Sequence, residues 1–372
     1  MKILVTGGAG FIGSHLVDAL VTRGHEVTIL DSLDPQVHPG GRPPDYLNPR
    51  ARFVRADIRD ADALKPLVLQ AEAVFHLASA VSVGQSQYEI SRYVSVNSAG
   101  TANLLDILAN EKHGVRKLVV AASMSSYGEG LYTCTRCGPV RPALRPDEQL
   151  ARREWQPLCP DCGLGVSPLP TPEEAALHSN SIYAVTKKNQ EEMCLLIGKT
   201  YSIPTVSLRY FNVYGPRQSL SNPYNGVAAI FLSRIKNGQP PVIYEDGDQT
   251  RDFVSVHDVA EVNLLALETN GADGRALNVG SGRPVRIREV AETLATVSGR
   301  EVGPEISGKF RKGDVRHCFA DTTRLATLLG FTPRVSFEQG IAELVSWSRT
   351  AQATDLFSQA REELLSRGLA SR

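Results

Sequence analysis

The first thirteen residues constrain the fold of this chain more than any other segment. An apolar run over residues 2–6 leads into Gly7, Gly10 and Gly13, and an apolar pattern of helical period follows over 12–23. In such a strand–turn–helix unit the first glycine permits the tight turn, the second lets the backbone approach a pyrophosphate, and the third lets the helix pack against the strand. Free N–H groups at the start of the helix face the phosphates. The segment therefore predicts a dinucleotide-binding turn.

A second strand, expected at 26–30, ends in Asp31. An acidic side chain at this point accepts hydrogen bonds from both ribose hydroxyls of NAD and repels the additional phosphate of NADP. The glycines alone also fit a tight turn that binds no ligand. Together with Asp31 they predict an NAD site.

The composition excludes several classes of partner. The 372 residues include 40 basic and 40 acidic side chains, so no overall field attracts nucleic acid or an anionic membrane. No stretch approaches about 20 consecutive apolar residues, and the N-terminus lacks a signal-peptide pattern. We therefore expect a cytoplasmic protein that binds neither nucleic acid nor membrane.

The order of predicted elements indicates the fold class. Strand-like and helical segments alternate through the first two thirds of the chain, which predicts an α/β fold with a Rossmann-like, doubly wound parallel sheet. The expected strands are 2–6, 26–30, 52–55, 73–77, 117–122 and 204–209, and the expected helices are 12–23, 61–70, 95–112 and 182–200.

Longer loops and shorter elements follow, so the chain is expected to divide into two domains and a tail. We expect an NAD-binding domain over 1–211 and a smaller C-terminal α/β substrate domain over 212–350, which includes a strand at 276–279. The polar segment 351–372 is expected to form a terminal helix or to be partly disordered.

Three residues form a candidate catalytic group. Tyr183 and Lys187 are four apart on a helical segment, so their side chains lie on one face. A nearby ammonium lowers the pKa of a tyrosine from its ordinary value near 10 toward the range of a general base. Ser123 ends a strand whose end points at the cofactor, and its hydroxyl can bridge the substrate and Tyr183. Without this context, Tyr183 and Lys187 are also consistent with two solvated surface residues. The hydroxyl of Ser123 is also consistent with a turn or a helix cap.

These residues belong to an ordered series of motifs that covers nearly the whole chain. The series is Thr6–Gly13, Asp57–Ile58, His76–Ala78, Asn97, Ser123, Tyr127–Gly128, Tyr183 with Lys187, Leu208–Arg217, Arg251–Val254 and Lys312–Asp314. With it the chain resembles the extended short-chain dehydrogenases/reductases, in particular the NAD-dependent nucleotide-sugar epimerases and dehydratases such as UDP-glucose 4-epimerase.

The resemblance implies residues for both ligands. NAD is expected to contact Gly7, Gly10, Phe11, Ile12, Gly13, Asp31, Ser32, Asp57, Ile58, Leu77, Ala78, Asn97, Tyr183, Lys187 and Tyr210. The nucleotide sugar is expected to contact Ser123, Asn212, Arg217, Arg251, Arg311, Asp314 and Cys318. Guanidinium and amide groups suit a diphosphate, although each arginine alone fits a surface charge.

Two further features follow from the same resemblance. The small Cys318 is implied to leave room for a bulky N-acetyl sugar, and it fits a buried hydrophobe equally well. A homodimer is implied through the helices at 95–112 and 182–200.

The residues after Ser123 separate the reactions of this family. Its dehydratases and decarboxylases carry an acidic residue just downstream of the catalytic hydroxyl, whereas this chain has Met124, Ser125 and Ser126. Elimination of water needs an additional acid and base. The sequence therefore favours a 4-epimerase that passes the C4 hydride to NAD and takes it back on the opposite face, with NAD tightly bound. A UDP-hexose or a dTDP-6-deoxyhexose such as dTDP-L-rhamnose is the expected substrate. A nicotinamide-dependent 4-ketoreductase or a dehydratase is the alternative.

An inserted segment over 130–168 carries two C-x-x-C pairs. Cys134 and Cys137, and then Cys159 and Cys162, are each followed by a glycine that suits the tight turn of a metal knuckle. Four protein thiolates leave no open metal position, so the spacing predicts a structural zinc site in a zinc-ribbon-like module. Disulfides or an iron–sulfur cluster are the alternatives. Five arginines against four acids are a poor footprint for nucleic acid, so a lid or a dimer contact is favoured over a binding module.

Overall fold

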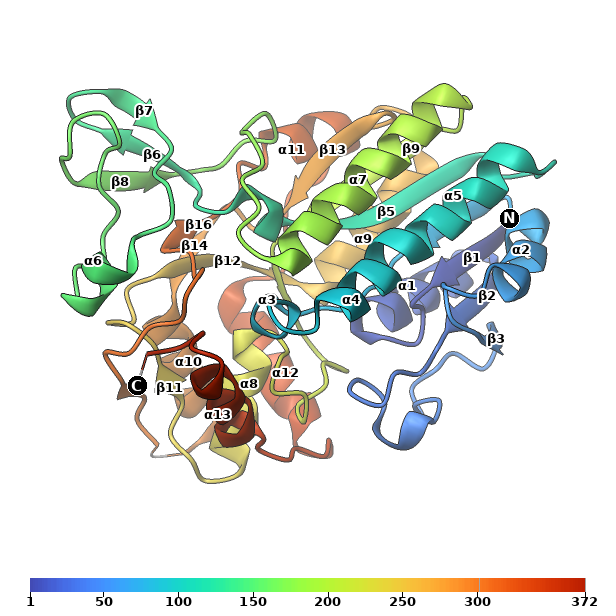
Figure 1. Cartoon of the computed structure of the whole chain (residues 1–372). Helices are drawn as coiled ribbons and strands as arrows, with labels where there is room; N and C mark the ends of the chain where they lie inside the picture. The colour runs from blue at the N-terminus through green and yellow to red at the C-terminus, as the bar shows by residue number, and fades with distance from the viewer. Residues whose placement is uncertain (301, 372) are drawn as a thin grey trace.

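A seven-stranded parallel sheet forms the centre of the computed structural model, which describes residues 1–300 and 302–371 (Figure 1). The strand order is β13-β9-β5-β4-β1-β2-β3. The bounds are β1 (Lys2–Thr6), β2 (Glu26–Asp31), β3 (Arg52–Arg55), β4 (Ala73–His76), β5 (Lys117–Ser123), β9 (Thr205–Tyr210) and β13 (Arg275–Val279). The central strands are mostly apolar, as expected of strands that helices cover on both faces. The predicted Rossmann-like fold is confirmed.

Helices pack on both faces of this sheet. One face is covered by α1 (Phe11–Thr22), α9 (Val256–Glu268) and α11 (Thr323–Leu329). The other is covered by α2 (Ala61–Gln70), α5 (Gly100–Asn110) and α7 (Ile182–Thr200). The segment predicted as one helix over 95–112 consists of two types of helix. The π-helical segment η2 (Val94–Ala99) leads directly into the α-helix α5. The short helices α3 (Val83–Ser86) and α4 (Ile90–Tyr93) lead into it.

A smaller lobe lies beside the carboxyl ends of the strands. Its helices are α8 (Val227–Lys236), α10 (Ile287–Ser298) and α12 (Phe337–Ser348), which share one apolar core. Its strands are β10 (Asn212–Tyr214), β12 (Thr250–Ser255), β14 (Pro284–Arg286) and β16 (His317–Cys318), with the separate pair β11 (Val242–Ile243) and β15 (Glu305–Ile306). The tail contains the helix α13 (Phe357–Ser366).

One predicted strand belongs to the other lobe. The sequence analysis places residues 276–279 in the substrate domain, but this segment is β13, which pairs with β9 at the edge of the large sheet. Its buried Leu277 and Val279 complete the apolar core there. The preceding helix α9 packs against α1 in the same core. The chain therefore returns to the first lobe after it has begun the second.

The inserted segment forms a small separate sheet at one end of the molecule, next to β14 and β16 (Figure 1). Its strands are β6 (Leu131–Cys134), β7 (Gly138–Val140) and β8 (Val166–Leu169), in the order β7-β6-β8, and α6 (Asp147–Ala151) follows β7.

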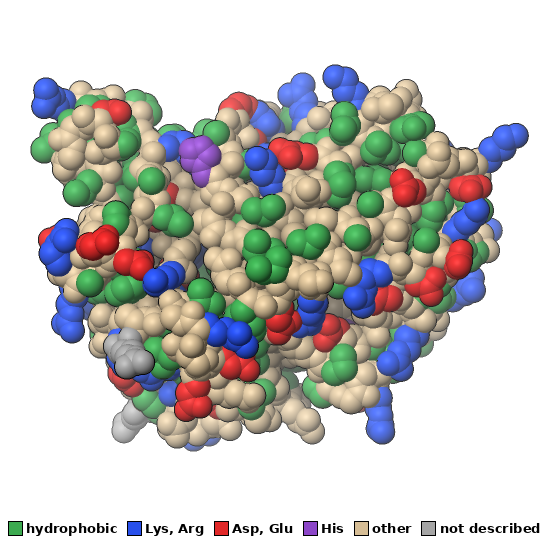
Figure 2. All heavy atoms as spheres, in the orientation of Figure 1, with side chains coloured by type: hydrophobic (Ala, Val, Ile, Leu, Met, Phe, Trp, Pro, Cys, Tyr) green, Lys and Arg blue, Asp and Glu red, His purple; other side chains and the backbone are tan. Residues whose placement is uncertain are grey.

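The surface carries both signs of charge without a large patch of either, as Figure 2 shows for one face. Among the described residues, no helix combines the length and the apolar character needed to cross a bilayer.

Candidate functional site

In the glycine turn after β1, two glycines pack closely against protein atoms and one borders open space. Gly7 has a φ of +72°, and a Cβ there would lie 2.8 Å from the backbone nitrogen of Ala78. A Cβ on Gly13 would lie 2.3 Å from the carbonyl oxygen of Gly7, so the helix packs close to the turn as predicted. A Cβ on Gly10 would meet only that oxygen, at 3.3 Å. Gly10 therefore faces a cavity rather than protein.

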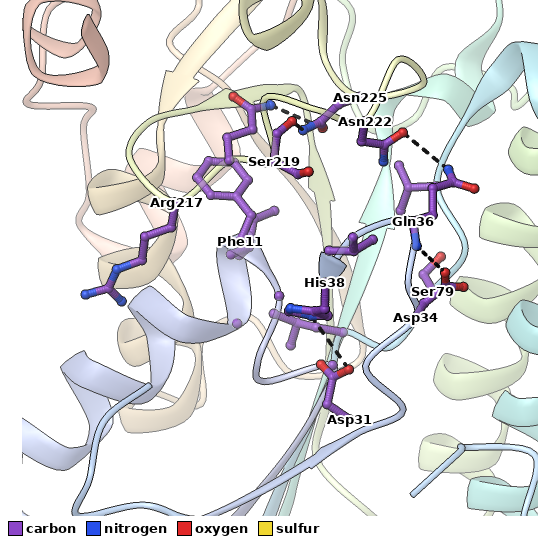
Figure 3. A pocket seen from close by; sticks show the side chains of 18 of the residues that line it. Phe11, Asp31, Asp34, Gln36, His38, Ser79, Arg217, Ser219, Asn222 and Asn225 are labelled. Atoms are coloured by element: carbon purple, nitrogen blue, oxygen red, sulfur yellow. Dashed lines mark hydrogen bonds and ion pairs between the residues drawn. The ribbon is translucent and has the colours of Figure 1, made fainter. Parts of the chain in front are cut away.

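This cavity, of about 1330 Å³, lies at the carboxyl ends of the strands and is shown from close by in Figure 3. It extends from the glycine turn to the catalytic residues and to the smaller lobe. The predicted cofactor residues that line it are Gly7, Gly10, Phe11, Ile12, Gly13, Asp31, Ser32, Asp57, Ile58, Leu77, Ala78, Tyr183, Lys187 and Tyr210.

Asn97 is the predicted cofactor residue that does not line the cavity. Its Nδ2 donates to the carbonyl oxygen of Ala80 (3.0 Å) and to Oγ1 of Thr186 (2.9 Å), and its Oδ1 accepts from the backbone nitrogen of Ala80 (2.7 Å). Both ends of the amide are thus used to hold the loop after β4 against α7. The structure gives Asn97 a supporting position behind the cavity wall.

Asp31 joins the glycine turn to the loop that follows β2. Its Oδ2 accepts from the backbone nitrogen of Ala9 (3.1 Å), and its Oδ1 accepts from that of Leu33 (2.9 Å). His38 points at the same carboxylate, with 4.0 Å between Nε2 and Oδ1 (Figure 3). Burial lowers the pKa of His38, which favours the neutral imidazole. The sequence analysis missed His38, which lies in a loop without a recognisable motif.

Ser123, Tyr183 and Lys187 meet on one wall of the cavity. Ser123 is the last residue of β5, and Tyr183 lies in the first turn of α7 with its backbone nitrogen bonded to Oγ of Ser86 (3.0 Å). Burial raises the pKa of Tyr183 to about 12, and a hydrogen bond with Ser123 opposes this rise. The predicted lowering of this pKa by Lys187 is therefore not found in the protein by itself, where desolvation raises the pKa and Ser123 is the group that opposes the rise.

Lys187 is held by a residue that the sequence analysis did not name. Its Nζ donates to Oε1 of Gln190 (2.7 Å), and Nε2 of Gln190 donates to Oγ1 of Thr101 (2.8 Å). Burial lowers the pKa of Lys187 to about 7. A carboxylate in place of the Gln190 amide would favour the ammonium, so the neutral partner leaves this pKa low. The spacing of three residues on α7 is the signal that could have identified Gln190.

Asn212 is the predicted substrate residue with the clearest position in the cavity. It begins β10 beside the cavity, and its Oδ1 is buried with no hydrogen-bond partner among the described residues. Buried acceptors in proteins are nearly always bonded, so this oxygen fits a donor supplied by a ligand.

Arg251, Arg311 and Asp314 lie together on neighbouring segments of the smaller lobe, outside the residues that line the cavity. Arg251 donates from Nη2 to the carbonyl oxygen of Val315 (2.6 Å), and Arg311 donates from Nε to Oδ2 of Asp314 (2.8 Å). The guanidinium of Arg311 lies 4.9 Å from the centre of the Tyr244 ring. The structure thus groups two of the three predicted arginines.

Arg217 and Cys318 lie elsewhere. Arg217 lines the cavity but forms an ion pair with Asp18 on α1 (2.7 Å), and Figure 3 shows its side chain extending away from Asn222 and Asn225. Cys318 is 1% exposed on β16, against Gly130 at the base of the inserted segment, and does not line the cavity. Neither residue could be placed from its motif, because each position depends on contacts with distant segments.

The four cysteines of the inserted segment converge. The sulfur atoms of Cys134, Cys137, Cys159 and Cys162 all lie within 4.8 Å of one another. Gly138 and Gly163 have φ values of +77° and +72°, so both knuckle turns need their glycine. The backbone N–H groups of Arg136 and Cys137 lower the pKa of Cys134 to about 7, whereas hydrogen bonding with Cys162 raises the pKa of Cys137 to about 12. This donor set fits a tetrahedral metal bound by four sulfurs.

Comparison with known proteins identifies the family. The model of the NAD dependent epimerase/dehydratase family matches residues 3–144 and 162–280. A dTDP-L-rhamnose 4-epimerase of Burkholderia thailandensis is 36% identical over 352 residues, which cover 93% of this chain and 94% of that protein.

Solved structures agree with this match. A UDP-glucose 4-epimerase of Thermotoga maritima, crystallised with UDP-glucose, has a TM-score of 0.77 and 32% identity and covers 94% of this chain and 99% of its own. A UDP-glucose 4-epimerase of Thermus thermophilus, in complex with NAD, has a TM-score of 0.74 and 31% identity. The match covers 95% of this chain and 100% of that chain. The chain belongs to the NAD-dependent epimerase/dehydratase family, and the prediction of an NAD-dependent epimerase is confirmed.

Proposed function

We propose that this epimerase inverts C4 of a nucleotide sugar, either a UDP-hexose or a dTDP-6-deoxyhexose such as dTDP-L-rhamnose. The observation that carries the proposal is that Ser123, Tyr183 and Lys187 share one cavity with the glycine turn. Ser123 is followed by Met124 and Ser125 rather than by a carboxylate. Both kinds of sugar nucleotide occur in the names of similar proteins.

The residues divide the proton chemistry among them. When bound, NAD supplies the acceptor and then the donor of the C4 hydride. Tyr183 takes the proton of the 4-hydroxyl as general base. It returns the proton after the 4-keto sugar has rotated in the site to present its opposite face to the cofactor. Ser123 donates a hydrogen bond to the same oxygen, and the Lys187 ammonium stabilises the phenolate. Because the hydride leaves and returns within one turnover, tight retention of NAD is part of the proposal.

A panel of sugar nucleotides tests this function. UDP-, dTDP- and GDP-sugars are incubated with the enzyme, and the products are identified by NMR. The expected result is a mixture of two 4-epimers without net consumption of NADH. Net consumption of NADH would instead identify a 4-ketoreductase, and loss of the 6-hydroxyl would identify a dehydratase. Absence of turnover for every sugar would refute the proposal.

We further propose that Cys134, Cys137, Cys159 and Cys162 hold one structural zinc ion. The convergence of their sulfurs supports this, and thiolates that bind metal fit the reducing cytoplasm. Native mass spectrometry of protein purified without chelator is expected to show one zinc per chain. Disulfide-linked masses, or iron with labile sulfide, would refute the zinc assignment.

We also propose a homodimer through the helices predicted at 95–112 and 182–200, with the contact surface extended to α4 and the start of η2. Ile90, Val94, Val185 and Leu196 are large apolar side chains of these helices that are between 44% and 63% exposed. Burial of such a face is the usual driving force for association. Analytical ultracentrifugation is expected to give a dimer for the wild type and for Val297→Asp, an exposed control on α10, and a monomer for Val94→Asp with Val185→Asp. A monomeric wild type would refute the proposal.

A further inference from the structure

Backbone hydrogen bonds attach the inserted module to the smaller lobe at both ends of the module, near Gly130 and near Thr171. On one side, the backbone nitrogen of Gly130 donates to the carbonyl oxygen of His317 (3.1 Å). On the other, the nitrogen of Thr171 donates to the oxygen of Phe319 (2.8 Å), and the nitrogen of Asp321 donates to the oxygen of Thr171 (3.0 Å). The module therefore brackets β16 and the residues that follow it, although the chain enters it from the large sheet.

Arg145 makes a buried contact between the module and this lobe. Its side chain is 1% exposed, and its guanidinium reaches three segments. Nη1 donates to the carbonyl oxygen of Trp155 (2.9 Å), both terminal nitrogens bond the carboxylate of Glu245 (2.9 Å each), and Nη2 donates to the carbonyl oxygen of Asp314 (2.9 Å). The planar fork of arginine makes such simultaneous contacts, whereas the point charge of lysine makes fewer.

The contacts of Arg145 adjoin the groups around Arg311. Asp314, whose carbonyl oxygen accepts from Arg145, uses its carboxylate to hold Nε of Arg311 (2.8 Å). Glu245 directly follows Tyr244, the ring over which Arg311 lies at 4.9 Å. Arg145 thus fixes both the backbone of the residue that pairs with Arg311 and the neighbour of the ring that stacks with it.

A buried charge cluster makes this contact difficult to replace. Glu245 also accepts from Nη1 of Arg316 (2.7 Å), and the backbone nitrogen of Arg316 donates to Oε1 of Glu129 (2.7 Å). The side chains of Arg145, Glu129, Glu245 and Arg316 are each 4% exposed or less. Removal of one member of such a cluster leaves an uncompensated buried charge, which weakens the local structure.

The family model passes over Arg145, because it matches residues 3–144 and resumes at 162. We propose that Arg145 is a positioning residue for the nucleotide part of the substrate, so that the inserted module forms part of the substrate site. Arg145 does not touch the ligand in this proposal. It holds Arg311 and Asp314, which lie outside the residues that line the cavity and which the resemblance to the family implies at the nucleotide, with the ring of Tyr244 against Arg311. The inference rests on the proposed function.

The test compares Arg145→Met with Arg152→Met, a control in the same module whose exposed side chain pairs only with Glu154. Holoenzyme is titrated with UDP and with dTDP by calorimetry, and the nucleotide that binds the wild type is then used throughout. Arg145→Met is expected to weaken its binding about tenfold or more and to raise KM for the sugar nucleotide by a similar factor. The kcat and the NAD and zinc contents are expected to stay close to those of Arg152→Met.

Other outcomes separate the possible failures. If the wild type binds neither UDP nor dTDP, the proposed function fails. If the wild type binds one of them and Arg145→Met binds it equally well, the positioning role fails while the proposed function stands. If Arg145→Met does not fold, Arg145→Lys decides, because it keeps the charge but not the fork. An intermediate KM supports the role, and a wild-type KM refutes it.

Discussion

The large sheet and the inserted module are stabilised by different means. Every residue of β5 is buried, and apolar clusters cover both faces of the sheet around it. The module buries only Tyr132, Cys134, Val140 and Cys159 in its own core. The sheet is therefore held by apolar burial distributed over many residues, whereas the module depends on its four sulfurs and on the Arg145 cluster. Loss of one of these sulfurs or of the Arg145 guanidinium should therefore disrupt the module and leave the sheet intact.

Removal of the proposed zinc ion is expected to have the largest effect on this comparison. Structural zinc contributes about 10 kcal/mol or more to the folding of small domains, so chelation should unfold the module. Hydrogen exchange is expected to increase over 130–168 and 310–316 and to stay unchanged in β5, with NAD retained. Cys159→Ser should behave in the same way, and addition of zinc to the chelated wild type should reverse the change. Unchanged exchange over 130–168 would show that the module is stable without metal.

Tyr183→Phe probes the sheet side of the comparison. Loss of the proposed general base is expected to lower kcat about 10²- to 10⁴-fold, because general base catalysis by a positioned side chain contributes about that factor. The NAD content and the affinity for UDP or dTDP should remain those of the wild type, in contrast to the Arg145 variants. Near-full activity with a sugar nucleotide would remove Tyr183 from the mechanism.

Two alanine substitutions in the glycine turn separate folding from cofactor binding. Gly13→Ala places a Cβ 2.3 Å from a backbone oxygen and is expected to lower the free energy of unfolding by about 1–3 kcal/mol. Gly10→Ala meets only one protein atom, at 3.3 Å, so it should cost less than about 1 kcal/mol and still lose NAD. Denaturant titration and the absorbance of bound cofactor measure the two quantities. Full NAD content in Gly10→Ala would show that the cofactor does not approach this residue.

The smallest expected effect concerns the pH dependence. The pKa of Lys187 is lowered to about 7, and the ammonium, which the mechanism needs, is lost as pH rises through that value. Gln190→Glu places a negative charge beside Nζ and therefore raises this pKa, so the alkaline limb of kcat/KM should move about one unit to higher pH. Glu192→Gln, an exposed charge change on the same helix, is the control. Equal profiles for both variants would show that Gln190 does not set the state of Lys187.

Local patterns predicted much of the fold. Residues 2–6, 26–30, 52–55 and 61–70 form elements within one residue of their predicted bounds, because strand and helix periods are properties of short segments. The strand 276–279 was recognised, but its place in the large sheet was wrong, because its pairing with β9 joins segments about 70 residues apart.

The site shows the same limit. Tyr183 with Lys187, and the four cysteines, could be grouped from the sequence because their spacing is itself the signal. Asn97 was expected at the cofactor, yet its amide is used by Ala80 and Thr186, which only the folded chain brings to it. Arg145 was passed over because an arginine in a polar loop has no local feature that distinguishes a buried fork from a surface charge.

The return of the chain to the large sheet through α9 and β13 has a consequence for the evolution and engineering of this enzyme. The smaller lobe is not one uninterrupted stretch of the gene. A chimera that replaces residues 212–350 with those of a relative would also replace the edge strand β13 and the covering helices α9 and α11 of the cofactor lobe. A graft meant to transfer substrate preference must therefore be made in three pieces, leaving 256–279 and 323–329 in place.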